Sequence, residues 1–192
     1  MPNRPSEEAS RHILDKAERL FLEKGYAQTK LRDLADSLAM KPASLYYHAP
    51  GGKEELWDRV IDRALKRHHD QLVQAAQQAS GDLRGQLRAM GYWLISQPPV
   101  NLISVVTSDS TQNTGLMADR IYEGLMRPVS KVIRQAKDRG EVRDIEPDLI
   151  SGVFVTSVNG MLPLARDNQL PASLQELVNQ LVDVLIDGIK RK

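Results

Sequence analysis

The chain has 192 residues, which is enough for one or two domains with a sizeable buried core. It contains no cysteine, which excludes disulfides and thiolate metal sites, and its formal net charge of +1 points to neither an acidic nor a basic partner. No uninterrupted apolar run reaches the length of a membrane span, and the first residues lack the apolar core of a signal peptide. We therefore expect a cytoplasmic protein.

The first predicted helix begins at Ser6, where two glutamates follow a good N-cap residue, and it ends at Gly25. Ile13, Ala17 and Phe21 recur along one side of it. This spacing predicts an amphipathic helix that buries that side.

Two short helices follow, separated by a break of about three residues, which is helix-turn-helix spacing. Leu31, Leu34 and Leu38 define the buried stripe of the first, and Pro42 lies where the second can take its first turn. The second helix concentrates cationic, hydroxyl and aromatic side chains, and residues 24–53 carry a local charge of +3. Such a surface suits phosphates and base edges.

These residues resemble the DNA-binding domain of TetR-family transcriptional regulators. The motif comprises Gly25, Tyr26, Thr29, Arg32-Asp33-Leu34-Ala35, Leu45-Tyr46-Tyr47-His48 and Lys53-Glu54-Glu55-Leu56. The resemblance implies an all-α fold with a three-helix DNA-binding domain at residues 1–52 and a helical bundle at 53–192. It further implies a homodimer on an inverted-repeat operator, most often a repressor that a small-molecule effector releases.

The resemblance also indicates which residues contact DNA. Lys41, Ala43 and Ser44 are expected to face base edges, with free backbone N–H groups at Ala43 and Ser44 because Pro42 has none. The other expected contacts grip the sugar-phosphate backbone, and the full predicted set is Thr29, Lys30, Lys41, Pro42, Ala43, Ser44, Tyr46, Tyr47, His48 and Lys53. For Tyr47, packing of its ring within the domain is the alternative.

The chain departs from the family pattern at three places. Ala39 stands where the turn usually has glycine, at a cost of about 1 kcal/mol for a positive φ. Lys41 replaces the usual serine cap of the second helix, and Ala49 replaces the aromatic that commonly follows the histidine. The Pro50-Gly51-Gly52 loop is one residue longer. The seating of the next helix is the feature that these changes affect.

The remaining signals are helical. Helices are expected at about 53–79, 83–96, 114–139 (with Pro128 inside it), 147–166 and 172–190, while 100–106 is compatible with either helix or strand. The last helix carries a broad stripe of Leu174, Leu177, Val178, Leu181, Val182, Leu185, Ile186 and Ile189. One interpretation places this stripe and the preceding helix in the monomer core. The other, which the family resemblance favours, is a two-fold four-helix bundle between two chains.

A ligand pocket is expected in the middle of the chain, because residues 91–118 combine apolar and polar side chains with Asp109 as their one carboxylate. The candidate lining residues are Met90, Trp93, Asn101, Met117, Tyr122, Met126, Phe154, Ser157, Asn159 and Met161. For each of the methionines ordinary core packing is the alternative. The predicted effector is small, largely apolar and not strongly cationic.

The sequence predicts no catalytic residue, no metal site and no cofactor. His68-His69-Asp70 is unsuited to a metal because neighbouring helical residues diverge by about 100 degrees. An alternative function, from a different class, is an all-helical dimeric module that binds a protein or lipid and uses the helix-turn-helix only for packing.

Overall fold

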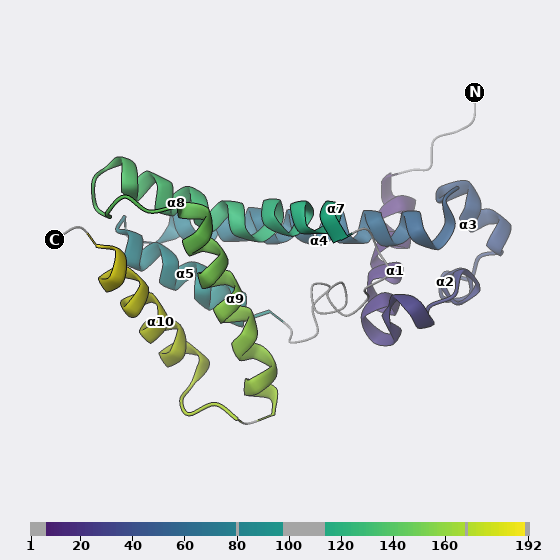
Figure 1. Cartoon of the computed structure of the whole chain (residues 1–192). Helices are drawn as coiled ribbons and strands as arrows, with labels where there is room; N and C mark the ends of the chain where they lie inside the picture. The colour runs from purple at the N-terminus through teal and green to yellow at the C-terminus, as the bar shows by residue number, and fades with distance from the viewer. Residues whose placement is uncertain (1–6, 80, 98–113, 168, 191–192) are drawn as a thin grey trace. The chain divides into compact units, whose positions relative to one another are not determined.

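The computed structural model describes residues 7–79, 81–97, 114–167 and 169–190, and within these ranges it contains helices and no strand (Figure 1). The expected all-α class is therefore confirmed. The chain divides into two compact units, residues 1–64 with 100–114 and residues 65–99 with 115–192. Helix α4 (Gly52–Gln78) contributes to both. The domain boundary at 52/53 stays a prediction.

The first unit contains the expected helix-turn-helix. Its helices are α1 (Glu7–Gln28), α2 (Leu31–Ser37), α3 (Pro42–His48) and the first half of α4. Gly25 interrupts α1 with φ 77°, as its expected role of ending the first helix requires. The turn between α2 and α3 places Ala39 at φ 52°, and the amide of Met40 donates to the Ala35 carbonyl at 2.9 Å. The positive φ expected at Ala39 is confirmed.

An aromatic cluster joins α1 to α4 within the first unit. The rings of Phe21 and Trp57 meet edge to face with centroids 5.0 Å apart, and the rings of Tyr26 and Trp57 are 5.1 Å apart. Trp57 is 2% exposed and Phe21 is fully buried. Arg63 on α4 also pairs with Asp15 and Glu18 of α1 at 2.6 and 2.5 Å. These contacts fix the start of α4 against the DNA-binding helices.

The second unit is a helical bundle. It comprises α5 (Leu83–Ile95), α7 (Thr114–Ile121), η1 (Tyr122–Met126), α8 (Arg127–Asp138), α9 (Pro147–Arg166) and α10 (Leu174–Ile189), besides the second half of α4. Helix α10 packs against α5 and α9, and α8 packs against α9 (Figure 1). Gly91 permits this packing, since a Cβ there would lie 2.6 Å from Cγ1 of Val178.

The helix expected at 114–139 continues through a π-helical turn rather than as regular α-helix. The amide of Arg127 donates to the Tyr122 carbonyl, five residues back, directly before Pro128. Proline has no N–H and its ring crowds the carbonyl four residues earlier, so the shift to five-residue spacing accommodates it. Gly124 within this turn allows close approach of α4, because a Cβ there would lie 2.8 Å from Cβ of Leu65.

Within the described residues one helix, α9 over Pro147–Ala165, is long and apolar enough to pass a membrane-span test on length and composition. The sequence reading found no run of that length because polar residues interrupt the segment. The core helix of a soluble protein passes the same test, so the finding is weak evidence for a membrane. Phe154 and Val158 of α9 are fully buried in the bundle.

Candidate nucleic-acid interface and effector site

One side of helix α3 is buried in the unit, and the other side is exposed to solvent. Leu45 and Ala49 are fully buried, whereas Tyr46 and Tyr47 are 51% and 52% exposed. The residues from Lys41 to Ser44 are also exposed. The half-exposed ring of Tyr47 shows that it does not pack in the core of its unit. A row of polar and aromatic groups is therefore available on one side of a firmly seated helix.

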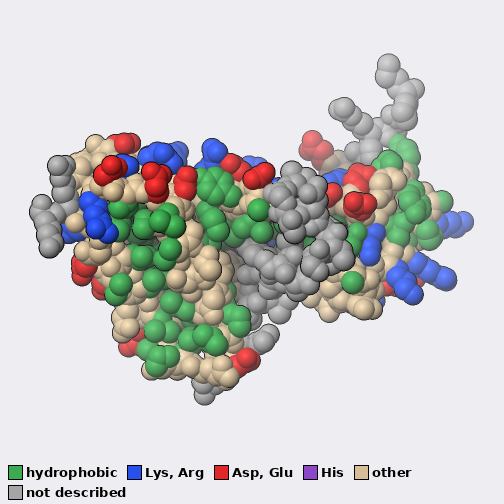
Figure 2. Space-filling view, viewed as in Figure 1, with side chains coloured by type: hydrophobic (Ala, Val, Ile, Leu, Met, Phe, Trp, Pro, Cys, Tyr) green, Lys and Arg blue, Asp and Glu red, His purple; other side chains and the backbone are tan. Residues whose placement is uncertain are grey.

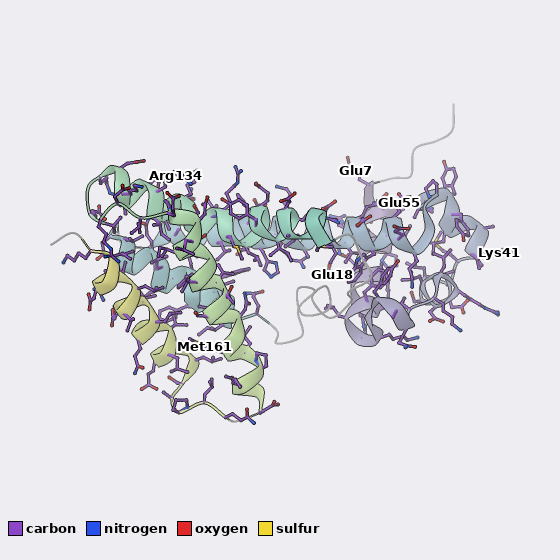
Figure 3. The ribbon with its side chains drawn as sticks, in the orientation of Figure 1. Glu7, Glu18, Lys41, Glu55, Arg134 and Met161 are labelled. Atoms are coloured by element: carbon purple, nitrogen blue, oxygen red, sulfur yellow. The ribbon has the colours of Figure 1, made fainter. Side chains whose placement is uncertain are left out.

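The cations around α3 differ in whether they are already paired. Lys24 pairs with Asp33 at 3.5 Å, and Arg32 has Asp36 at 3.9 Å. The side chain of Lys41 forms no hydrogen bond or ion pair with the described part of the chain, and it lies at the outer edge of the unit (Figure 3). Figure 2 shows Lys and Arg side chains gathered over the region of α2 and α3. Lys41 is thus free to bind an external acceptor.

Two predicted DNA contacts point inward in the structure. Thr29 is fully buried, and its hydroxyl donates to the Gly25 carbonyl at 2.7 Å. The Nζ atom of Lys53 donates to the Tyr26 carbonyl at 3.0 Å and lies 4.0 Å from the centre of the Tyr26 ring. Both side chains therefore hold the segment between α1 and α2 in place, and neither is presented to a phosphate in this structure.

Fewer backbone amides at the start of α3 are free to donate a hydrogen bond than the sequence predicts. The Ser44 amide donates to the Lys41 carbonyl at 2.9 Å, so it is not a free donor. Lys41 caps the helix without a side-chain hydrogen bond, as its replacement of serine predicts. At the other end, His48 is half-buried and stands edge to face with Tyr47, 5.4 Å between ring centroids. The exposed side chains of α3, rather than its backbone amides, are therefore its main groups for contact with an external ligand.

Two side chains of α4 bond to the α3–α4 connection: Glu55, which the sequence places in the motif without a role of its own, and Arg59, which lies outside the motif. Nη1 of Arg59 donates to the His48 carbonyl at 3.1 Å, and the amide of Gly51 donates to Oε2 of Glu55 at 2.8 Å. Glu55 lies near the start of α4, beside this loop (Figure 3). The available sequence signal was the four-residue spacing of Glu55 and Arg59, which places them on one face of a helix.

The candidate effector residues lie in several environments of the second unit. Met90 and Phe154 are fully buried, Met117 is 9% exposed, and Trp93 stands edge to face with His68 at 5.1 Å. Asn101 lies outside the described residues. The remaining candidates are half-buried: Tyr122, Met126, Ser157, Asn159 and Met161. The structure does not bring these side chains together around a described cavity, and their binding role stays a prediction.

Tyr122 is already hydrogen-bonded. Its hydroxyl donates to Asp148 at 2.9 Å, and the hydroxyl of buried Ser130 donates to the same carboxylate. Hydrogen bonds, first from Ser130 and then from Tyr122, hold the pKa of Asp148 below its usual value. Burial, followed by the bond to Asp148, raises the pKa of Tyr122. The pair joins η1 and α8 to the start of α9.

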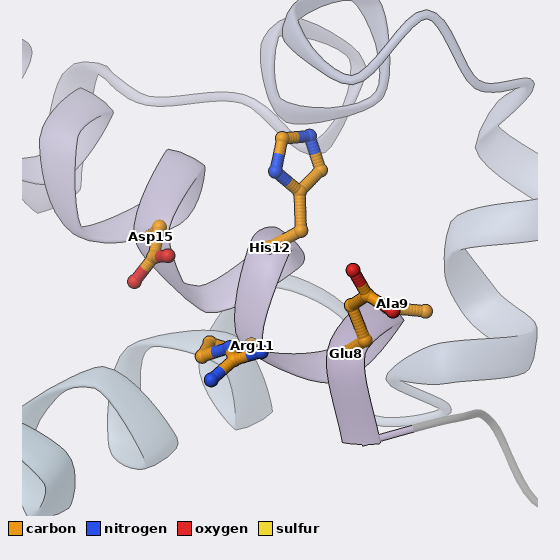
Figure 4. Close-up of a pocket in the computed structure, with 5 residues that line it drawn as sticks. All are labelled: Glu8, Ala9, Arg11, His12 and Asp15. Atoms are coloured by element: carbon orange, nitrogen blue, oxygen red, sulfur yellow. The ribbon is translucent and has the colours of Figure 1, made fainter.

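The side chains that line a surface hollow on α1 do not converge on a common point. Glu8, Ala9, Arg11, His12 and Asp15 line it, all from one helix. Figure 4 shows the charged side chains and the imidazole projecting in different directions. The described residues also contain no group of three His, Cys, Asp or Glu side chains that could hold a metal ion.

Comparison with known proteins identifies the first unit. Residues 13–60 match the family described as "Bacterial regulatory proteins, tetR family". The biofilm operon negative transcriptional regulator IcaR of Staphylococcus epidermidis is 42% identical over 65 residues, 30% of this chain and 35% of that protein. The match thus spans about a third of that relative's length. The transcriptional repressor DhaR of Mycobacterium sp. is 22% identical over 191 residues, 91% of each chain.

Solved structures share the fold over the whole length. A transcriptional regulator from Saccharomonospora viridis in complex with choline has a TM-score of 0.74 at 23% identity, covering 97% of this chain and 100% of its own. AibR in complex with isovaleryl coenzyme A and operator DNA has a TM-score of 0.68 at 20% identity, covering 92% and 97%. At these identities the likeness shows the fold alone. The matched helix-turn-helix identifies residues 13–60 as a DNA-binding region of the tetR family of bacterial regulatory proteins.

Proposed function

We propose that this protein is a sequence-specific DNA-binding transcriptional regulator, and that it acts as a repressor which a small-molecule effector releases from its operator. The observation that carries the proposal is the open face of α3, where the Lys41 side chain has no partner among the described residues and Tyr46 and Tyr47 are half exposed. This face is exposed to solvent in the folded unit, and a phosphate backbone or a base edge would supply its cation with a partner. The described residues present no metal-binding cluster that would support an enzymatic function.

In the proposed complex, α3 enters the major groove. Lys41 donates to a guanine edge, and Ala43 and Ser44 make the remaining base contacts. The side chains of Lys30, Tyr46, Tyr47 and His48 contact phosphates and fix the register, because contacts to the backbone position a protein without specifying sequence. Thr29 and Lys53 support this surface from inside the unit through their bonds to Gly25 and Tyr26. DNA in the cytoplasm of a bacterium is directly accessible to such a regulator.

Lys41→Ala tests the division between base and phosphate contacts. We expect affinity for the operator to fall by about 1–3 kcal/mol, with discrimination relaxed at a single base pair, because a base-reading side chain is lost. Titration of the variant against operators substituted at each position measures this. An equal loss on every operator variant, together with a smaller salt dependence, would instead assign Lys41 to a phosphate. Lys66→Ala on the exposed surface of α4, where Lys66 pairs with Asp70 of its own helix, is the charge control.

We further propose that the protein is a homodimer through α9 and α10. Half of the apolar stripe on α10 belongs to the monomer core, because Val178, Val182, Ile186 and Ile189 are buried in the bundle. A second apolar face remains outside, formed by Leu149, Val153 and Leu164 of α9 and Val184 of α10, all 43–71% exposed. Figure 2 shows hydrophobic side chains gathered over these two helices. The same faces from a second chain would complete a four-helix bundle.

The proposed effector is small, largely apolar and not strongly cationic. The carboxylates nearest to the candidate residues face away or are already satisfied: Asp119 is exposed, Glu123 pairs with Arg127 at 2.7 Å, and Asp148 accepts from Tyr122 and Ser130. A buried cation would therefore find little to neutralise it among the described residues. Because the Tyr122 hydroxyl already donates its hydrogen bond to Asp148, Asn159 is the better candidate for orienting a ligand.

A thermal-shift screen followed by operator release tests the effector proposal. We expect apolar ligands to raise the melting temperature and to release operator DNA, since a ligand that stabilises one state must oppose a ligand that favours the other. The panel includes choline and isovaleryl coenzyme A, because fold neighbours contain them. Hits confined to organic cations would contradict the predicted ligand class. Hits that stabilise the protein and never release DNA would contradict induction.

A further inference from the structure

Side chains of α4 form a specific set of bonds to the connection between α3 and α4. Two residues from a single turn of α4 bond to the last residue of α3 and to the loop Pro50-Gly51-Gly52. Nη1 of Arg59 donates a hydrogen bond to the carbonyl of His48, the last residue of α3, at 3.1 Å. Oε2 of Glu55 accepts a hydrogen bond from the amide of Gly51 at 2.8 Å. Nη1 of Arg59 also lies 3.6 Å from Oε1 of Glu55, which orients the two groups together.

The two glycines allow this arrangement sterically. A Cβ on Gly51 would lie 3.0 Å from Cβ of Glu55 and 3.2 Å from its Oε2, too close for an unshifted side chain. Gly52 has φ 65°, and a Cβ there would touch Cε1 of Tyr46 at 3.4 Å. Glycine is the residue that adopts such a φ without strain. The loop can therefore lie flat on the Glu55 side of α4.

The bonds also meet a need of the recognition helix. Helix α3 has only seven residues, so its last carbonyls lack partners within the helix, and its helical state depends on external contacts. Arg59 supplies one such contact to the carbonyl of His48. Because Arg59 and Glu55 are rigidly spaced on α4, α3 follows any displacement of the first turns of α4.

We propose that Glu55 and Arg59 form a clamp that sets the orientation of α3, and hence that they are positioning residues for base reading. This inference rests on the proposed function of DNA binding. The clamp holds α3 to α4 by a carbonyl and an amide on opposite sides of the loop. Removing either side chain frees α3 to shift relative to α4 while the buried anchors Leu45 and Ala49 keep the unit folded.

The first test compares specific and non-specific DNA affinity for Arg59→Gln and Glu55→Ala over a salt series, with an operator obtained by selection and a scrambled duplex. We expect the affinity for the operator to fall about 3- to 10-fold, as for the loss of one hydrogen bond. Affinity for the scrambled duplex and the salt slope should stay unchanged. Glu54→Ala, an exposed acidic neighbour of Glu55, is the matched control and should change neither affinity.

The alternative outcomes separate other roles. If Arg59→Gln lowers both affinities equally and reduces the salt slope by about one, Arg59 binds a phosphate directly and the clamp is wrong. If the melting temperature falls while the ratio of specific to non-specific affinity is kept, the pair is merely structural. The double variant should lose no more than the larger single loss, since the two residues act as one device; full additivity would contradict the clamp.

Amide hydrogen exchange tests the clamp without DNA, so it remains informative if the proposed function fails. In both variants the amides of Ala49 and Gly51 should exchange faster, whereas those of Ala17 and Phe21 in α1 should not change. Unchanged exchange at Ala49 and Gly51 would overturn the clamp whatever the DNA result. Wild-type protein that binds no DNA sequence specifically would instead overturn the proposed function and leave the clamp to be judged by exchange alone.

Discussion

Replacing Val184 with glutamate is expected to convert the protein from a dimer to a monomer and to abolish operator binding at physiological salt. Val184 is 71% exposed on α10, so the charge leaves the core of the monomer intact. In the proposed bundle it would be buried without a partner, which costs about 3–5 kcal/mol per site, and symmetry provides two sites. Sedimentation at micromolar concentration measures the mass, and operator titration measures the affinity.

Gln175→Glu is the matched control for this variant. Gln175 is exposed on the same helix, and nine residues at 100 degrees each place it half a turn from Val184. It should leave both mass and operator affinity unchanged. Val184 is a sharper choice than Leu181 or Leu185, which are half-buried and whose replacement would also disturb the bundle. A Val184→Glu dimer that binds operator normally would show that the interface lies elsewhere. A monomeric wild-type protein would show that there is no such interface.

Trp57→Ala is expected to destabilise the DNA-binding unit by about 3–5 kcal/mol, because it empties a core site and removes the contacts of the Trp57 ring with the rings of Phe21 and Tyr26. For a chain of this size that corresponds to a loss of roughly 10 °C in melting temperature. Operator binding should fall with it, since the cluster carries the junction of α1 with α4. Circular dichroism melting and urea unfolding measure the change.

Trp57→Phe serves as the control, because it keeps an aromatic ring in the site and should retain more than half of the stability lost in Trp57→Ala. A Trp57→Ala variant with unchanged melting temperature would contradict the central place of this cluster in the fold. Near-unchanged operator affinity at a temperature where the variant is partly unfolded would contradict the coupling of fold to DNA binding.

The helix-turn-helix could be predicted from sequence because its evidence is local. The spacing of Leu34, Leu38 and Leu45, with a turn residue at 39 and Pro42 at the start of a helix, depends on contacts within a few turns. The structure confirms this arrangement, including the positive φ of Ala39. The expected bounds of the helices after α3 agree with the structure to within about two residues for the same reason, since glycine and proline punctuate them. Helix α1 runs to Gln28, past the expected end at Gly25.

The orientations of single side chains could not be predicted in this way. Thr29 and Lys53 carry polar groups at positions that face DNA in the family pattern, yet here they bond to the backbone of Gly25 and Tyr26. Those carbonyls became accessible only because Gly25 breaks the helix, which places acceptors from one segment beside donors from another. Similarly, the sequence pattern of the last helix does not distinguish Val184 from the leucines around it. Only the packing of the helix shows that Val184 lies on its exposed face.

The most direct test of the account is selection of duplexes from a random DNA pool by the wild-type protein, followed by titration of the enriched sequence over a salt series. A dimeric regulator should enrich an inverted repeat whose half-sites lie one helical turn or a multiple apart, with affinity well above that for scrambled DNA. Lys41→Ala should relax the enriched sequence at one position in each half-site. Binding of equal strength to all sequences, or none at moderate salt, would contradict a sequence-specific regulator.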